Sequence, residues 1–448
     1  MQAARVHGKT TAIVGLGASG FSVVRHLRAR GEAVCAFDTR EAPPFLRRLR
    51  SLAPELEVRL GAMGPDALAG FDRIVVSPGV PVSVEAVRRA RERGAEVIGD
   101  VELFAREVTA PVVAVTGSNG KSTVTTLVGE MARAAGADVE IGGNIGTPVL
   151  DLVDQAEPEL FVVELSSFQL ETTSSLRPKA ATVLNVSADH MDRYRDIEDY
   201  AAAKGRVFAH AGVQVVNRDD PRSVALAQPG HRVVGFGSGR PETAEDFGLD
   251  RQGETVWLCK GDRHLLNTTE LRIRGEHNWI NVLAALALGE AAGLPMKPML
   301  EAARAFAGLP HRSEWVAHRA GMDWYNDSKA TNVGATAAAL KGMPGRIVLI
   351  AGGEGKDADF SELRPLLASK ARAVVLIGRD AQHLARAIEG VAPVVFADSM
   401  QDAVVRAAEL GEPGDSVLLS PACASFDMFP GFEARGEAFR QAVEEVIR

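Results

Sequence analysis

Cysteine is scarce in this chain of 448 residues, and its three cysteines, Cys35, Cys259 and Cys423, lie far apart. Their separation excludes a disulfide framework and a Cys-x-x-Cys metal site, and it is typical of a protein from a reducing compartment. Long apolar runs are also missing, since no stretch approaches the roughly 18 residues that a membrane-spanning helix requires. The first residues pass directly into an expected strand without a targeting segment. We therefore expect a cytoplasmic protein without membrane insertion.

A surplus of positive charge is absent as well, because 50 Lys and Arg residues stand against 58 Asp and Glu residues. The formal net charge of -8 at pH 7 argues against a nucleic-acid partner. An anionic substrate must therefore be met by local lysines, arginines and helix ends. What the chain does have, 46% hydrophobic and 24% charged residues, is the composition of a globular protein, and its length suggests about three domains.

Three blocks of alternating strand and helix patterns follow one another along the chain. Such alternation is typical of parallel sheets covered by helices, so the predicted fold class is α/β with three domains. The expected domains are residues 1–106, 107–309 and 310–448, with linkers at residues 109–111 and 308–310.

The first block opens with a strand and the glycine pattern GLGASG at residues 15–20. Gly15, Gly17 and Gly20 form Gly-x-Gly-x-x-Gly, and Asp38 follows about twenty residues later, as a dinucleotide site requires. A tight strand-to-helix turn with another ligand, or with none, explains the same residues equally well. A second strand ends in a rigid loop, residues 77–81, near the carboxyl edge of the expected sheet, where ligands bind in open α/β folds.

The second block contains the most informative segment, an apolar strand followed by TGSNGKST at residues 116–123 and a helix start. Glycines at 117 and 120 permit a tight turn whose backbone N–H groups converge on phosphate oxygens, aided by the helix N-terminus. Lys121 supplies a cation and Ser122 a hydroxyl ligand for magnesium. The spacing is shorter than in the common P-loop, and a plain strand-to-helix turn is the alternative. We predict nucleotide binding.

Two further residues of this block, Glu164 and His190, lie at or just beyond the ends of apolar strands. There they are suitable ligands for magnesium held against phosphates. A helix-capping carboxylate and a core histidine are the alternatives. Lys204 follows in an expected helix and, taken by itself, is interpreted as a solvated surface lysine.

In the third block, polar residues again occupy strand ends, with helix caps and solvated lysines as the alternative interpretation. A loop of small residues follows the last strand and can bring the backbone close to a ligand. The polar residues are Asp327, Lys329, Thr331, Lys356 and Ser425.

Together these motifs resemble those of the Mur ligases, ATP-dependent enzymes that form amide bonds in bacterial cell-wall synthesis. The resemblance covers essentially the whole chain. Residues 116–123 are similar to the family's ATP loop, residues 275–281 (GEHNWIN) to its adenine-binding segment, and residues 311–312 to the entry of its C-terminal domain. Four further segments are similar to those of the D-glutamate-adding member: GLGASG at 15–20, ELSSFQLE at 164–171, NDSKATN at 326–332 and SPACASFD at 420–427.

The resemblance implies a Rossmann-like N-terminal domain that holds the UDP part of the substrate, rather than a dinucleotide. A central P-loop ATPase-like domain and a C-terminal Rossmann-like, amino-acid-binding domain would follow. The implied reaction joins D-glutamate to UDP-N-acetylmuramoyl-L-alanine through an acyl phosphate, with ATP and two Mg²⁺ ions, in peptidoglycan precursor synthesis. We expect the enzyme to act as a monomer.

The resemblance also implies roles for individual residues. ATP would contact Gly117, Ser118, Asn119, Gly120, Lys121, Ser122, Thr123, Asn278, Asn281, Arg312 and Asp327. The magnesium ligands would be Ser122, Glu164, His190 and Lys204, with Lys204 carbamylated, and Lys121, Glu164, His190 and Lys204 would form the catalytic set. The two other substrates would contact Gly17, Ala18, Ser19, Asp38, Thr39, Ser77, Gly79, Asn144, Lys329, Thr331, Lys356, Ser425 and Phe432.

Two alternative functions remain at this point. A sister ligase would add a different amino acid, such as L-alanine, a diamino acid or a folate-linked glutamate. A nucleotide-binding protein that is not a ligase, such as a dehydrogenase that uses residues 15–20, is more distant.

Overall fold

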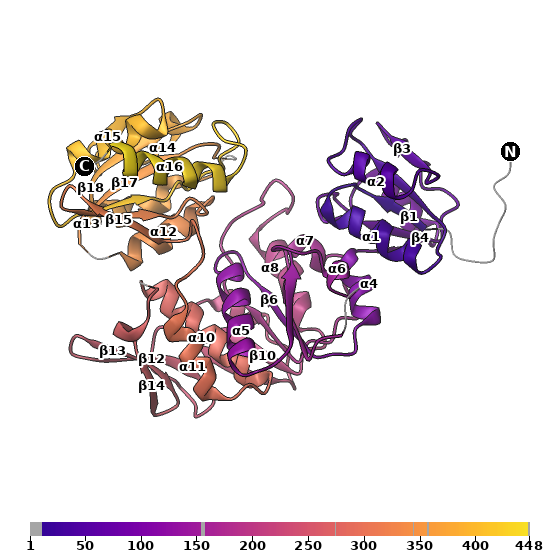
Figure 1. Ribbon diagram of the computed structural model, residues 1–448, viewed down its shortest axis with the longest axis horizontal. Helices are drawn as coiled ribbons and strands as arrows, with labels where there is room; N and C mark the ends of the chain where they lie inside the picture. The colour runs from indigo at the N-terminus through magenta and orange to yellow at the C-terminus, as the bar shows by residue number, and fades with distance from the viewer. Residues whose placement is uncertain (1–10, 154–156, 274, 344, 356–357, 447–448) are drawn as a thin grey trace.

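The chain folds into three lobes, each built around one sheet (Figure 1). The computed structural model describes residues 11–446 except 154–156, 274, 344 and 356–357. None of the helices within these described residues is long and apolar enough to cross a bilayer.

The N-terminal lobe contains a five-stranded sheet of order β3-β2-β1-β4-β5, in which all neighbouring strands are parallel. Its elements are β1 (Thr11–Val14), α1 (Ala18–Ala29), β2 (Val34–Asp38), α2 (Leu46–Leu52), β3 (Val58–Leu60), β4 (Arg73–Val76), α3 (Glu85–Glu92) and β5 (Glu96–Ile98). Helix α4 (Asp100–Glu107) leads out of this lobe. The expected Rossmann-like fold of the N-terminal domain is confirmed.

The central lobe contains a nine-stranded sheet of order β14-β13-β12-β11-β10-β9-β6-β8-β7. Its first part comprises β6 (Val112–Thr116), α5 (Lys121–Ala134), β7 (Val139–Gly143), α6 (Val149–Val153), β8 (Leu160–Glu164), α7 (Ser167–Leu170), β9 (Ala180–Val183), α8 (Ile197–Gly205) and the 3₁₀ helix η1 (Arg206–Phe208). Its second part comprises β10 (Val213–Asn217), α9 (Pro221–Ala225), β11 (Arg232–Phe236), β12 (Phe247–Gln252), β13 (Thr255–Lys260), β14 (Arg263–Asn267), η2 (Thr268–Glu270), α10 (Glu276–Ala291) and α11 (Met296–Ala305).

One edge of this central sheet departs from the expected parallel pattern. Strands β12, β13 and β14 pair antiparallel and form a meander that continues the parallel strands. Tight turns at Gly253 and Gly261, which have φ values of 60° and 50°, leave no room for the crossover helices that parallel pairing requires.

The C-terminal lobe contains a six-stranded sheet of order β15-β16-β20-β17-β18-β19, parallel except for the first pair. Its elements are β15 (Glu314–Arg319), β16 (Met322–Asn326), α12 (Val333–Gly342), β17 (Ile347–Gly352), η3 (Phe360–Leu363), α13 (Arg364–Lys370), β18 (Ala371–Ile377), α14 (Ala381–Ala387), β19 (Val394–Phe396), α15 (Met400–Leu410), β20 (Ser416–Leu419) and α16 (Phe432–Val446). The alanine-rich helix expected at residues 334–341 is α12.

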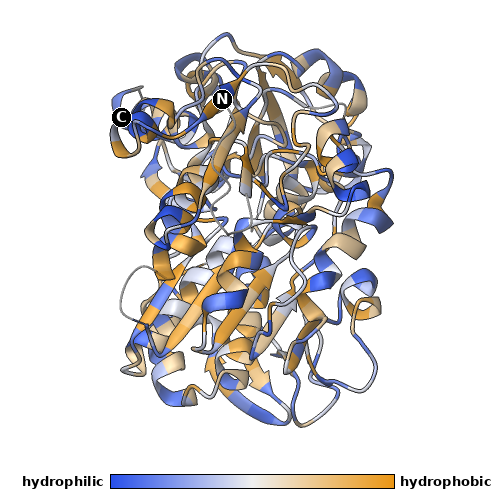
Figure 2. Cartoon of the chain, turned by 90° about the vertical axis from the view of Figure 1, so that its right-hand side faces the viewer, coloured by the Kyte–Doolittle hydropathy of each residue, from blue (hydrophilic) through white to orange (hydrophobic). Residues whose placement is uncertain are grey.

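Apolar strands form the centre of each lobe, as the hydropathy colouring in Figure 2 shows. In β6, all five residues of the sequence VVAVT are buried, because helices cover both faces of the sheet. Helices α5, α10 and α11 pack on one face, and α4, α6, α7 and α8 lie on the other. The inner strands therefore place their carboxyl ends, and the loops that follow them, at a fixed edge of the sheet.

Helix α4 joins the N-terminal lobe to the central lobe through a shared apolar core. Its Val101 and Phe104 are buried, and the Phe104 ring contacts Phe161 of β8 edge to face, with centroids 5.2 Å apart. Ile13 of β1 and Val24 of α1 belong to the same cluster. Polar contacts across the interface include Arg25 to Asp151 at 2.8 Å and His26 to Glu107 at 2.7 Å.

The C-terminal lobe is attached differently, because its two apolar clusters are its own. Polar side chains connect it to the central lobe: Arg312 Nη2 donates to Ser122 Oγ at 2.7 Å, and Asn332 Nδ2 donates to Asp189 Oδ2 at 3.1 Å. We propose that the domains divide at 106/107 and 309/310. The first of these boundaries lies at the last residue of α4.

The third glycine of the GLGASG turn has a packing role that the second lacks. A Cβ on Gly20 would lie 1.8 Å from the carbonyl oxygen of Gly15, whereas a Cβ on Gly17 meets nothing within 4 Å. We expect Gly20→Ala to destabilise the N-terminal lobe by about 1–3 kcal/mol, because the backbone must move. Urea unfolding followed by circular dichroism measures this, and Gly17→Ala, the matched control, should stay within about 0.5 kcal/mol of the parent. Equal losses in both variants would contradict this explanation.

Candidate active site

The loop between β6 and α5 has the geometry of a phosphate-binding turn. Gly117 and Gly120 have φ values of 150° and 84°, and α5 starts directly after them at Lys121. The Ser118 N–H donates to the Asn185 carbonyl oxygen, and the Asn119 N–H donates to the Asn185 side chain. Asn185 thus fixes the loop before any ligand binds, and the N-terminus of the fourteen-residue helix α5 directs its free N–H groups toward the same space.

Three cations surround this loop. Lys121 Nζ donates to the carbonyl oxygens of Gly117 and Ser118, at 2.9 and 3.0 Å. Lys204 Nζ donates to the same Gly117 oxygen at 2.9 Å, and the Arg312 guanidinium approaches from the C-terminal lobe. Burial lowers the pKa of Lys121 and of Arg312. Glu164 offsets part of this effect at Lys121 and at Arg312, and a bound polyanion would offset more of it.

Lys204 is the residue for which the structure corrects the expectation from the sequence alone. Its side chain is buried, not solvated, and its ammonium lies 4.2 Å from the centre of the Tyr200 ring. Burial, and next the charge of Lys121, hold the pKa of Lys204 well below its usual range. The uncharged amine is therefore more accessible than it is in a solvated lysine.

Glu164 is positioned to bind a cation beside the phosphate loop. Its Oε1 accepts a hydrogen bond from Asn144 Nδ2 at 2.7 Å. Its Oε2 is buried without a hydrogen-bond partner among the described residues, which is costly for a carboxylate oxygen. Gly143 lies so close that a Cβ there would be 2.3 Å from the Glu164 carbonyl oxygen.

His190 follows β9 in a left-handed conformation, with φ of 57°. Its ring packs against Phe168, with centroids 4.8 Å apart, and Nε2 lies 3.8 Å from Asp189 Oδ2. The core-histidine alternative does not fit, because its side chain is more than one-third exposed.

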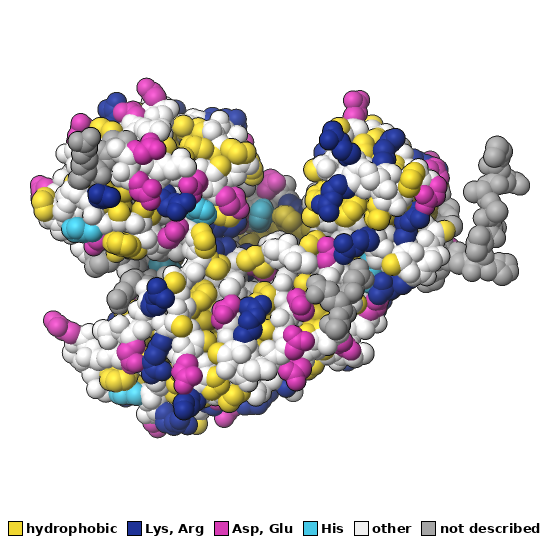
Figure 3. All heavy atoms as spheres, in the orientation of Figure 1, with side chains coloured by type: hydrophobic (Ala, Val, Ile, Leu, Met, Phe, Trp, Pro, Cys, Tyr) yellow, Lys and Arg dark blue, Asp and Glu magenta, His cyan; other side chains and the backbone are white. Residues whose placement is uncertain are grey.

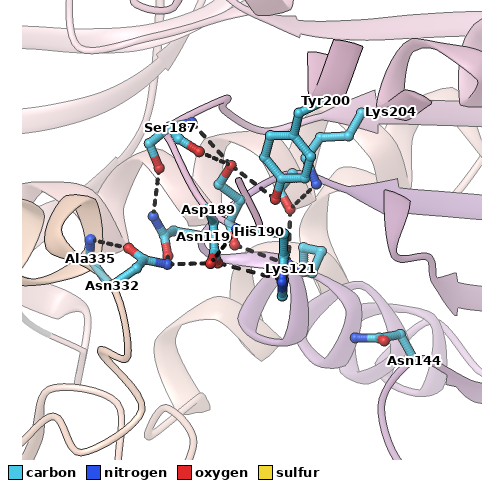
Figure 4. Close-up of polar contacts among 12 residues, drawn as sticks. Asn119, Lys121, Asn144, Ser187, Asp189, His190, Tyr200, Lys204, Asn332 and Ala335 are labelled. Atoms are coloured by element: carbon cyan, nitrogen blue, oxygen red, sulfur yellow. Dashed lines mark hydrogen bonds and ion pairs between the residues drawn. The ribbon is translucent and has the colours of Figure 1, made fainter. Parts of the chain in front are cut away.

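Asp189, Asn119 and Asn332 join the two lobes at this site (Figure 4). Asn332 Nδ2 donates to Asp189 Oδ2, and its Oδ1 caps α12 by accepting the Ala335 N–H at 2.8 Å. Ser187 lies beside them and accepts from Asn119 Nδ2 at 3.3 Å. The start of α12 is therefore held over the phosphate loop.

A cavity of about 670 Å³ extends from the loop between the central and C-terminal lobes. Most residues of its walls are polar or charged, and Leu184, Phe236 and Ile280 add apolar surface. That composition suits a planar base with a polar rim. Of the residues predicted to bind ATP, the following line it: Asn119, Gly120, Thr123, Asn278, Asn281, Arg312 and Asp327. Gly117, Ser118, Lys121 and Ser122 form the adjoining turn.

At the far wall, Asp327 and Lys329 lie at the end of β16. Burial raises the pKa of Asp327 to about 7, although Ser420 Oγ and the Ser313 N–H donate to its carboxylate. Burial, and next Arg312, lower the pKa of Lys329 to about 8, and its ammonium lies 3.9 Å from the centre of the Phe432 ring. A cation on an aromatic face offers a contact for a carboxylate.

A buried arginine aligns the two loops of this wall. Arg435 of α16 donates to Ser328 Oγ and to the carbonyl oxygens of Ser328, Cys423 and Ala424. It thereby ties the segment that precedes Lys329 to the segment that precedes Ser425. Thr331 follows in the same turn, with its N–H bonded to the Lys329 carbonyl oxygen. Lys356, predicted to act here, lies outside the described residues.

The substrate residues predicted in the N-terminal lobe gather at the carboxyl edge of its sheet. Asp38, at the end of β2, accepts from the Leu16 N–H at 2.7 Å and from Arg40. These hydrogen bonds lower the pKa of Asp38 against the opposing effect of burial. Ser77 Oγ donates to the Gly15 carbonyl oxygen at 2.8 Å. The neighbouring positions complete this edge: Gly17, Ala18, Ser19, Thr39 and Gly79.

A wide hollow separates this edge from the C-terminal lobe, with the central lobe below it (Figure 3). Lys and Arg side chains lie on the surface of the N-terminal lobe beside the hollow. The predicted residues therefore form two groups, one in the N-terminal lobe and one around the phosphate loop and the C-terminal lobe. Asn144, bonded to Glu164, lies on the central lobe.

Several residues of the site were not predicted. Asp189, Asn185, Tyr200, Asn332 and Arg435 reveal their roles only through contacts across long sequence separations. Asp189 stands directly beside the predicted His190, and Asn332 closes the predicted NDSKATN segment, so both could have been included.

The donors present fit magnesium. Glu164 Oε2 lacks a partner among the described residues, and Ser122, whose hydroxyl accepts from Arg312, lies in the first turn of α5. Carboxylate and hydroxyl oxygens are ligands that Mg²⁺ prefers. His190 is a less typical ligand for so hard a cation.

Comparison with known families agrees with this site. Residues 9–99 match the Mur ligase MurD-like N-terminal domain, residues 115–289 the Mur ligase middle domain, and residues 311–423 the glutamate ligase domain of Mur ligases. The chain belongs to the Mur ligase family.

Curated relatives match over nearly the whole length. UDP-N-acetylmuramoylalanine--D-glutamate ligase of Nitrosococcus oceani is 52% identical over 440 residues, covering 98% of this chain and 97% of the relative. The ligase of the same name from Pseudomonas aeruginosa is 51% identical over 438 residues, covering 97% of each chain.

Solved structures show the same fold at low identity. A pseudomurein peptide ligase type C from Methanothermus fervidus has a TM-score of 0.63 at 17% identity, covering 98% of this chain and 100% of that one. UDP-N-acetylmuramate-alanine ligase MurC from Thermotoga maritima has a TM-score of 0.60 at 19% identity, covering 98% and 99%.

The burial of Lys204 has a measurable effect on stability. Because its pKa is lower in the folded chain than in the unfolded chain, the unfolded chain binds more protons, and stability rises with pH up to the unfolded value near 10.5. Without ligands, we expect the free energy of unfolding to rise from pH 7 to 9.5 more steeply in the parent than in Lys204→Met, by up to about 1.4 kcal/mol per pH unit. Urea unfolding in CO₂-free buffer measures both slopes, and parallel slopes would refute the prediction.

Proposed function

We propose that the chain joins D-glutamate to UDP-N-acetylmuramoyl-L-alanine at the expense of ATP. It is an ATP-dependent ligase of peptidoglycan synthesis, in accord with its family and with relatives of that name. The observation that carries the proposal is the cluster of cations around the phosphate loop, which faces an amino-acid site on the C-terminal lobe.

The reaction needs a leaving group, because a carboxylate oxygen does not leave. The alanyl carboxylate attacks the γ-phosphorus of ATP and releases ADP, which gives an acyl phosphate. The D-glutamate amine then attacks the acyl carbon, and the tetrahedral intermediate expels phosphate. Both steps depend on positioning and charge neutralisation rather than on a covalent nucleophile.

In this proposal Lys121 and Arg312 neutralise the transferring phosphate, while the backbone of residues 117–120 holds its neighbours. Asn278 and Asn281 contact the adenine, and Asp327 the ribose end. Ser122 and Glu164 would hold one magnesium ion, and His190 with a carbamylated Lys204 a second. When bound, magnesium supplies positive charge that offsets the charge of the polyphosphate.

The amino-acid end of the site explains the choice of a dicarboxylate. Lys329, stacked on Phe432, and Ser425 offer a cation and a hydroxyl, and Thr331 stands in the same turn. Lys356 completes the proposed set. The UDP portion would lie along residues 17–19, with Asp38, Thr39, Ser77 and Gly79 around it, and Asn144 would contact the muramyl-alanine end.

Phosphate release from ATP tests the substrate assignment. With Mg²⁺ and UDP-N-acetylmuramoyl-L-alanine, we expect release with D-glutamate and less than about one-hundredth of that rate with L-glutamate, L-alanine, L-lysine or diaminopimelate, because a misplaced or missing second carboxylate forfeits its contacts with the site. Omission of the UDP substrate is the control. Release with another amino acid would identify a sister ligase, and silence throughout would refute ligase activity.

Carbamylation of Lys204 is tested separately. A neutral amine attacks CO₂, and burial favours that form of Lys204 over the ammonium. After incubation with ¹³C-bicarbonate at pH 8, we expect one ¹³C carbamate resonance that is missing in Lys204→Met and retained in Lys179→Met, a change at a lysine that bonds the Ala292 carbonyl oxygen. A spectrum without this resonance, or one unchanged in Lys204→Met, would exclude the modification.

A further inference from the structure

The antiparallel edge of the central sheet carries a cluster of polar side chains on its outer face. Leu249 and Leu258 point into the core, so the alternate residues of β12 and β13 lie on the opposite face. There Cys259 pairs with His264 of β14, and Asp250 pairs with Trp257. Figure 1 shows these strands at the far end of the central lobe from the N-terminal lobe.

Three potential ligand atoms converge at this place. One atom each from Asp250, Cys259 and His264 lies within 4.8 Å of the other two. His264 Nε2 is 2.8 Å from Asp250 Oδ2. The imidazole is held by the Trp257 ring, on which it stacks at 4.9 Å with an angle of 5° between the planes. The bulge in the pairing of β13 with β14 lies next to Cys259 and sets this geometry.

Neighbouring groups support the cluster and leave one side open. The backbone of residues 239–241 covers Gly248, where a Cβ would lie 2.2 Å from the Gly239 carbonyl oxygen. Arg240 Nε is 3.1 Å from Asp250 Oδ1, its Nη2 donates to Oδ2 at 3.2 Å, and Gln252 donates to Oδ2 at 3.0 Å. Cys259 is 2% exposed, whereas the His264 side chain is 34% exposed and marks the open side.

We propose that Asp250, Cys259 and His264 bind a divalent transition-metal ion, with Zn²⁺ the best match. A carboxylate, a thiolate and an imidazole are the donors that Zn²⁺ takes in proteins, at distances that place neighbouring ligand atoms about 3.3–3.7 Å apart in a tetrahedron. The observed separations reach that range with side-chain shifts on the order of 1 Å. Magnesium is a poor match, because thiolate and imidazole are soft ligands.

Binding changes the hydrogen bonds of the cluster in a defined way. The Cys259 thiol, whose Sγ lies 3.6 Å from the Trp257 carbonyl oxygen, releases its proton to solvent. His264 keeps a proton on Nδ1, so that Nε2 is free to bind the metal. Asp250 Oδ2 exchanges its contacts with Arg240 Nη2, Gln252 and His264 for the ion, while Oδ1 keeps Arg240 Nε as an outer-shell partner. Three ligands leave a fourth position for water.

The ion would connect all three antiparallel strands. Because β12 pairs with β11, which carries Phe236 of the nucleotide cavity, the site lies close to the ATP pocket without contributing a side chain to it. We expect metal binding to raise the thermal midpoint of the apo protein, since an ion that binds only the folded chain stabilises it. The ligase reaction itself does not require this ion.

Cobalt spectroscopy on the full chain, stripped of metal and freed of any affinity tag, tests the site. We expect one equivalent of Co²⁺ to produce a thiolate-to-cobalt absorption band in the near ultraviolet, and one equivalent of Zn²⁺ to abolish it. Only a cysteine can produce this band, so cobalt in the magnesium sites does not contribute. Cys259→Ser should lose the band, and the double variant Cys35→Ser/Cys423→Ser, the matched control, should keep it.

Two further variants keep the test decisive if Cys259→Ser does not fold. His264→Gln, at the exposed ligand, should weaken Co²⁺ binding at least tenfold while ATP-dependent ligation stays unchanged. Arg263→Gln, at the adjacent exposed position, should change neither. The proposal would be overturned if the parent lacked the band or if Cys259→Ser kept it. It would also be overturned if the double control lost the band or if His264→Gln bound Co²⁺ with the affinity of the parent.

Discussion

The crowding of three buried basic side chains at one backbone turn links the central and C-terminal lobes of this molecule. Lys121 and Lys204 both donate to the Gly117 carbonyl oxygen, and Arg312 reaches the same turn from another lobe. Their charges are disfavoured in the apo state, and burial lowers the pKa of each. A polyphosphate relieves this strain, so ligand binding and the docking of the C-terminal lobe are coupled electrostatically.

The two outer lobes are attached to the central lobe by different kinds of interaction. Helix α4 and the rings of Phe104 and Phe161 form part of a continuous apolar core with the N-terminal lobe. The C-terminal lobe is held through polar contacts, such as those of Arg312 and Asn332, which exchange readily with water and ligand. A firmly attached N-terminal lobe is thus combined with a C-terminal lobe that is free to adjust.

Much of this was accessible from the sequence, because strand periodicity and glycine-lysine turns are local signals. The α/β class, the three sheets and the phosphate loop follow from such patterns. The antiparallel edge of the central sheet could not be predicted in this way. A short strand has the same sequence pattern in a parallel and in an antiparallel pair until its partner strand is known. Lys204 shows the limit most clearly: on an alanine-rich helix it has the pattern of a surface lysine, and only the packing of Tyr200 and residue 117 buries it. Arg435 acts through Ser328, more than one hundred residues away, which no local pattern encodes.

The contrast between the two interfaces bears on inhibitor design. A compound that binds where residues 77–81 of the N-terminal lobe meet the central lobe, near the hydrogen bond from Arg193 to the Pro78 carbonyl oxygen, encounters a surface already set by a shared core. It loses little affinity to reorganisation of the protein. A compound that bridges the nucleotide cavity and the C-terminal lobe must also hold that lobe in place, so part of its binding energy is consumed in ordering the enzyme. The interface of the N-terminal and central lobes and the cavity beside the C-terminal lobe therefore place different energetic demands on an inhibitor.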